Sequence, residues 1–128
     1  MELNNYAISN GTYNNLPTSV TSNTFIVNLI DGLSLTKSAD KTNWVNGSLE
    51  YTLVLKNDTS VAYVNPVLSD TLDISYVTFV SGSVLVNGEV LDSSKYTYES
   101  GTGLLTINLD TVAENSEVTI KFSVNKKS

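Results

Sequence analysis

The chain has 128 residues, with 13 acidic side chains against 7 basic ones and a formal net charge of −6. This length fits one domain with its own core, and the acidic balance argues against nucleic acid or an anionic membrane surface as a partner. The chain contains no cysteine and no histidine, which excludes disulfides, thiolate metal sites, cysteine nucleophiles and Ser-His-Asp triads. No apolar run is long enough to span a bilayer, so we expect no membrane insertion in this segment.

The first thirty residues differ in composition from the rest. Two short strands are expected here, around residues 6–8 and 24–29, separated by a span rich in Asn, Gly, Thr, Ser and Pro. Asn10-Gly11 is a turn signal, and residues 16–19 read as a loop. Asp31-Gly32 then interrupts the pattern. We therefore predict an N-terminal extension over residues 1–30 and a domain over residues 31–128.

From residue 33 onward, short strands alternate with turns. The expected strands cover residues 33–38, 49–57, 61–69, 77–80, 84–86, 90–91, 96–98, 104–109 and 118–124. Asn46-Gly47 and Asn87-Gly88 are typical of tight turns between antiparallel strands, while Pro66 favours a bulge or an edge position. No window has a helical period. The sequence predicts an all-β fold, an immunoglobulin-like antiparallel β-sandwich of about seven strands.

Three polar residues are in phase with apolar residues on the faces expected to point into the core. Side chains alternate between the two faces of a strand, which places Lys37 with Leu33 and Leu35. By the same rule Asn57 shares a face with Leu53 and Leu55. Asp70, in turn, shares one with Leu68 and Leu72. Because burying an isolated charge is costly, the three groups are expected to meet.

A meeting of these groups would permit a self-formed cross-link. Burial favours the neutral amine of a lysine and the protonated form of a carboxyl group. Lys37 could then attack the Asn57 carboxamide while Asp70 acts as the catalytic proton donor that polarises its carbonyl, with loss of ammonia. The plainer alternatives are a buried Lys–Asp ion pair with Asn57 as a hydrogen-bonding neighbour, or strand ends that reach solvent.

The order of several short motifs resembles a bacterial surface repeat. These motifs are residues 33–40, 45–47, 51–53, 56–57 and 68–72, followed by residues 79–84 and 86–88. In this order they resemble the DUF11 family, the conserved-repeat domain of Gram-positive surface proteins, over residues 33–126. The Pro-Ala-Gly that usually follows Asp-Thr-Leu in the family is replaced here by Asp73-Ile74-Ser75.

The resemblance implies a structural stalk or spacer repeat of an extracellular, cell-wall-associated protein. Its partners would be neighbouring repeats of the same polypeptide, and residues 20–28 would be the closing strand of a preceding repeat. Some related domains carry a Lys–Asn isopeptide bond, and by position Lys37, Asn57 and Asp70 would fill those roles. Asn125 is the alternative asparagine, but it is out of phase with the inward face of its strand.

Other functions remain open from the sequence. The main alternative is an adhesin module that recognises a glycan or a host protein through its loops, and Trp44 could serve as a stacking platform or cap the core. Asp70 and Asp73 lack the spacing of a calcium site, so no metal or cofactor is expected. A carboxylate-based glycosidase is disfavoured because the acids are scattered at turns. We expect no enzyme activity beyond a single-turnover self-cross-linking.

Overall fold

The computed structural model describes residues 2–5, 7–22, 25–28 and 31–127, and it divides the chain into two units, Met1–Asp31 and Gly32–Ser128. The division falls next to Gly32, whose φ of +93° is accessible mainly to glycine. Within the described part of the chain, no helix has the length and hydrophobicity that crossing a bilayer requires.

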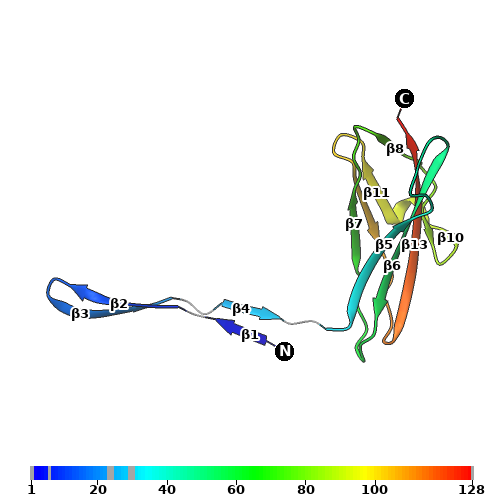
Figure 1. Cartoon of the computed structure of the whole chain (residues 1–128). Helices are drawn as coiled ribbons and strands as arrows, with labels where there is room; N and C mark the ends of the chain where they lie inside the picture. The colour runs from blue at the N-terminus through cyan, green and yellow to red at the C-terminus, as the bar shows by residue number, and fades with distance from the viewer. Residues whose placement is uncertain (1, 6, 23–24, 29–30, 128) are drawn as a thin grey trace. The chain divides into compact units, whose positions relative to one another are not determined.

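The described residues of the first unit form four strands that pair as an antiparallel ribbon (Figure 1). These are β1 (Glu2–Asn5), β2 (Ile8–Tyr13), β3 (Leu16–Thr21) and β4 (Phe25–Asn28). Strand β1 pairs with β4, and β2 pairs with β3.

The turn of this ribbon is not where the sequence predicted it. Asn10-Gly11 lies inside β2, and the chain reverses at Asn14 and Asn15, whose φ values are +52° and +66°. Two central residues with positive φ define the type I′ turn that suits a two-residue hairpin, and asparagine tolerates this conformation. The predicted loop at residues 16–19 is therefore part of β3. Tyr6, Thr24 and Leu29, which belong to the predicted strands, lie outside the described residues.

Over residues 32–127, the second unit is an antiparallel β-sandwich of nine strands, more than the seven or so predicted. The strands are β5 (Leu33–Ala39), β6 (Ser48–Asn57), β7 (Val67–Thr71), β8 (Val77–Phe79), β9 (Leu85–Val86), β10 (Glu89–Val90), β11 (Tyr96–Glu99), β12 (Leu104–Asn108) and β13 (Ser116–Lys126). A short 3₁₀ helix, η1 (Ser93–Lys95), precedes β11.

Two sheets form the layers of the sandwich. The larger has the order β10-β9-β13-β6-β5, with β8 also paired to β13, and the smaller has the order β11-β12-β7. Figure 1 shows β7 and β11 in one layer and β5, β6 and β13 in the other. The count exceeds seven because the short strands β8, β9 and β10 form at segments that the sequence predicted as strands.

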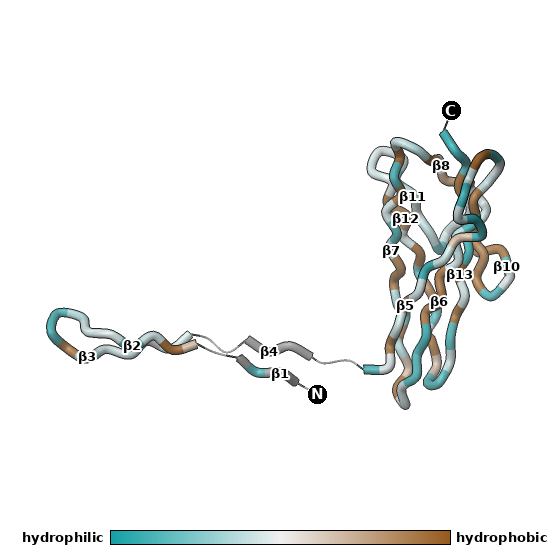
Figure 2. Tube along the Cα trace, viewed as in Figure 1, coloured by the Kyte–Doolittle hydropathy of each residue, from teal (hydrophilic) through white to brown (hydrophobic). Residues whose placement is uncertain are grey.

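The core between the layers follows the predicted alternation. Along β13, the buried positions recur at every second residue, with Ile120, Phe122 and Val124 fully buried. Leu105 and Ile107 of β12 and Val84 meet them from other segments. Figure 2 shows hydrophobic residues, in brown, spaced along the strands of the sandwich.

Two predictions about the edge of the sandwich were wrong. The segment at residues 61–66 forms only an isolated bridge, Tyr63 to Val112, and the strand that follows begins at Val67 and includes Asp70. Pro66 cannot donate a ladder hydrogen bond, which accounts for the late start. Leu35 is 50% exposed rather than buried, because β5 is the outermost strand of its sheet.

The two ends of the sandwich chain lie at opposite ends of one sheet. Leu33, the first residue of β5, pairs with Asn57, the last residue of β6. Asn125, near the end of β13, pairs with Ser48, the first residue of β6. The entry and exit of the chain are thus separated by the whole length of β6, and Figure 1 shows β5 beginning at the lower end and β13, in red, ending at the upper end.

Candidate functional site

An ion pair joins the two sheets at the β5 edge. The Nζ of Lys37 lies 2.7 Å from a carboxylate oxygen of Asp70, and the two side chains are 41% and 8% exposed. Lys37 is on the inward face of β5 and Asp70 is on the inward face of β7. The predicted faces of both residues, and their meeting, agree with the structure.

An aromatic ring completes this arrangement. The Lys37 ammonium lies 4.3 Å from the centroid of the Tyr51 ring, within the range of a cation–π contact. Tyr51 in turn packs against Phe122 at a centroid distance of 5.4 Å, which fixes the ring. A charge that points inward from an edge strand also opposes pairing with another sheet, since the added strand would have to desolvate it.

Asn57 occupies a different place, at the far end of β6. Its side chain is fully buried, and its Nδ2 lies 2.9–3.2 Å from the backbone oxygens of Val61, Val112 and Ala113. Its Oδ1 accepts from the backbone N–H of Thr59 at 3.0 Å and from the Thr59 hydroxyl at 2.7 Å. One carboxamide thus ties the end of β6 to the turn after it and to the segment before β13.

The structure does not bring Asn57 to Lys37, so the predicted cross-link has no support in this geometry. Asn57 pairs with Leu33, whereas Lys37 pairs with Leu53, four residues away along the same strand. At a rise of about 3.4 Å per residue this is roughly 14 Å. Both polar atoms of the carboxamide are already bonded, and Asp70 faces the lysine rather than the amide. Asn125, the alternative acceptor, is exposed on β13, as its phase predicted.

The residues that complete these two clusters were missed by the sequence reasoning. No role for Tyr51 or Thr59 was predicted from the sequence. For Thr59 a signal was present, because Asn-x-Thr at the end of a strand is typical of an Asx turn, in which the asparagine side chain accepts from the backbone N–H two residues on. The carbonyl groups of Val112 and Ala113 carry no side-chain signature that a sequence could reveal.

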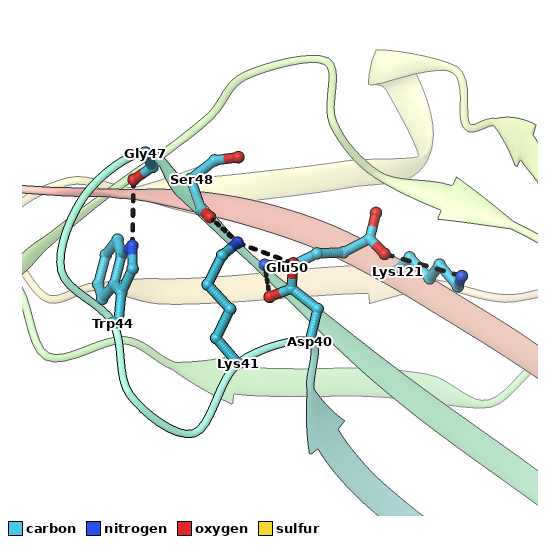
Figure 3. A network of polar contacts seen from close by, with 7 residues as sticks. All are labelled: Asp40, Lys41, Trp44, Gly47, Ser48, Glu50 and Lys121. Atoms are coloured by element: carbon cyan, nitrogen blue, oxygen red, sulfur yellow. Dashed lines mark hydrogen bonds and ion pairs between the residues drawn. The ribbon is translucent and has the colours of Figure 1, made fainter.

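A third polar cluster organises the loop after β5 (Figure 3). The Asp40 carboxylate accepts from the Glu50 N–H at 2.9 Å and from Lys41 Nζ at 3.0 Å, and Lys41 also donates to the Ser48 carbonyl at 2.7 Å. The Glu50 N–H, and then the Lys41 ammonium, hold the pKa of Asp40 below its usual value. Trp44 donates to the Gly47 carbonyl at 3.1 Å and packs against the core, which supports its predicted role as a cap.

The acidic residues that the structure describes do not gather into a metal site. Among the described residues, no three histidine, cysteine, aspartate or glutamate side chains form a group that could hold a metal ion. Asp70 is paired with Lys37, and Asp73 accepts from the Ser75 N–H at 3.0 Å in its own turn.

Comparisons with protein-family models, with curated proteins and with solved structures found no match. The resemblance to the DUF11 repeat therefore stays a prediction.

Proposed function

We propose that this chain is a structural stalk or spacer repeat of an extracellular, cell-wall-associated bacterial protein. The observation that carries the proposal is the course of the chain through the larger sheet. The chain enters at the start of β5 and leaves at the end of β13, and β6 lies between these two strands, antiparallel to both.

This course determines how tension would act. A pull on the two ends draws β5 and β13 in opposite directions along their own axes. The hydrogen bonds of the β5–β6 and β6–β13 ladders lie perpendicular to the strands, so the pull loads them in shear and many must break together. Domains joined end to end in this way would also extend a chain rather than fold it back.

The sequence supports a tandem arrangement. Asn-Leu-x-Thr occurs at residues 15–18 and again at residues 108–111, a spacing of 93 residues. At the same spacing, the apolar alternation of Phe25 and Val27 matches that of Val118 and Ile120. The distance from Leu33, where β5 begins, to Lys126, where β13 ends, is also 93 residues. One period therefore covers the sandwich, and residues 15–28 correspond in sequence to residues 108–121.

Pulling on single molecules in two geometries tests the proposal. In the first, the full chain is held by its two ends. In the second, it is held by its N-terminus and by a cysteine at position 58 (Asp58→Cys), which is unique because the chain has no other cysteine. The second geometry pulls on adjacent ends of β5 and β6 and opens their ladder one bond at a time. We expect a several-fold higher unfolding force between the two ends, and equal forces would contradict a load-bearing role.

A further inference from the structure

The side of the sandwich opposite the Lys37 edge carries a groove with a mixed aromatic and hydroxyl lining. It has a volume of about 540 Å³ and lies between β8 of the larger sheet and β11 of the smaller one. Phe79 and Tyr98 stack with their ring centroids 4.8 Å apart, and Tyr96 contacts Phe79 edge to face at 6.1 Å. The three rings pack against the core and are therefore held in place without a ligand.

Hydroxyl groups surround these rings. Ser81, Ser93 and Ser100 line the groove and are exposed. Within the described part of the chain, their hydroxyl groups make no hydrogen bond. The Tyr96 hydroxyl accepts from the Gly82 N–H at 3.1 Å, which leaves its own hydrogen free to donate.

The charge of the groove is opposite to that of the molecule. Lys127 is the one charged side chain among the described lining residues. It donates one of its three N–H groups to the Ile74 carbonyl at 2.9 Å, which leaves two for a ligand. None of the described lining residues carries a carboxylate, although the chain as a whole has a net charge of −6. A ligand with a negative group would therefore meet a local cation here.

We propose that this groove binds a saccharide that carries a carboxylate. A sugar ring has a C–H face that packs on an aromatic ring, whose π face is electron-rich, and it has a rim of hydroxyl groups. The fixed rings and the unpaired serine hydroxyls match these two features, and Lys127 matches the carboxylate. A proline-rich peptide could use the rings and offer its carbonyl groups to the serines, but its proline side chains carry no negative group for Lys127 to bind.

The proposal is tested on the full chain, first with an array of neutral and acidic oligosaccharides. Direct titrations follow, with a galacturonic acid tetrasaccharide, the matching galactose tetrasaccharide that lacks the carboxylates, and a proline decapeptide. We expect retention of acidic saccharides and tighter binding of the galacturonic acid ligand than of its neutral counterpart. Retention of no saccharide, equal binding of the two tetrasaccharides, or binding of the peptide alone would overturn the proposal.

Variants locate the site. We expect Tyr98→Ala to weaken binding about tenfold, which corresponds to the loss of one ring contact. Lys127→Gln is expected to remove the preference for the acidic ligand and its salt dependence. Because Tyr98 also packs against Phe79, a second variant, Ser100→Gln, fills the groove while keeping the rings. Tyr13→Ala, in the first unit, and Lys56→Gln, at the end of β6, are the matched controls, and binding that responds to them instead would place the site elsewhere.

Discussion

The Asn57 cluster and the Lys37–Asp70 pair show two ways in which this sandwich accommodates polar groups on its inward faces. Asn57 is neutral and fully buried, with every polar atom bonded to a neighbouring segment. Lys37 is charged and 41% exposed, and it pairs across the sheets where the sandwich is open. The buried Asn57 amide can therefore stabilise the fold by joining segments, whereas the charged Lys37 lies where solvent still reaches it. We expect a large effect on stability from the first cluster and a small one from the second.

Removing the Asn57 side chain should have the largest effect. Asn57→Ala removes the side-chain donor to the Ala113 carbonyl and the acceptor of the Thr59 N–H, and it leaves a cavity. We expect a loss of about 3–4 kcal/mol in the free energy of unfolding, measured by urea denaturation. The matched control is Asn125→Ala, at an exposed asparagine of β13, which should change stability by less than about 0.5 kcal/mol. Equal losses in the two variants would show that burial of Asn57 does not matter.

Substitution of Gly103, which lies near the end of β7 that carries Asp70, tests how backbone strain rather than charge affects stability in that region. Gly103 has a φ of +79°, and a Cβ there would collide with the Leu72 carbonyl oxygen, next to the Leu72 N–H that donates to Gly103 at 2.8 Å. We expect Gly103→Ala to cost about 2–3 kcal/mol from the combined strain and overpacking. Gly101, two residues earlier, has open space around it and no positive φ. Gly101→Ala should therefore leave the thermal midpoint nearly unchanged, and a similar drop in both would refute the steric account.

The Lys37–Asp70 pair should contribute little by comparison. A double-mutant cycle with Lys37→Met and Asp70→Asn is expected to give a coupling of about 0.5–1 kcal/mol, because the lysine is partly solvated. The coupling should fall as salt rises. A coupling above that of the Asn57 cluster, or one that salt leaves unchanged, would mean that the pair is more deeply sequestered than its exposure indicates.

Asp40 should show the smallest effect, and one that depends on pH. The Glu50 N–H and Lys41 lower the pKa of Asp40 in the folded state. The stability that this carboxylate contributes is therefore fully present above its unfolded pKa of about 3.9, and it is lost as the pH falls through the lower folded pKa. We expect Asp40→Asn to be slightly less stable than the native chain at pH 7. The two proteins should converge as the pH falls below about 4, as thermal melts across that range would show. A gap that persists at pH 2 would assign the effect to another cause.

Much of the fold could be predicted from the sequence, and the site only in part. The alternation rule gave the correct inward faces for Lys37, Asn57 and Asp70, because the period of a strand is independent of its neighbours. It could not give the register. Whether Lys37 lies opposite Leu53 or opposite Asn57 depends on the length of the loop after β5. That loop is fixed by hydrogen bonds of Asp40, Lys41 and Trp44, which no local sequence pattern reveals. Likewise, Asn10-Gly11 is a stronger turn signal than Asn14-Asn15, where the chain reverses four residues later, so the sequence predicted the turn at the wrong place.

Intact-mass measurement of the purified chain tests most directly whether Lys37 and Asn57 belong to two separate clusters. We predict the full mass calculated from the sequence, with Lys37 free to be acetylated and unlinked peptides after digestion. A chain lighter by one ammonia, with a linked peptide that contains both Lys37 and Asn57, would contradict the arrangement described here.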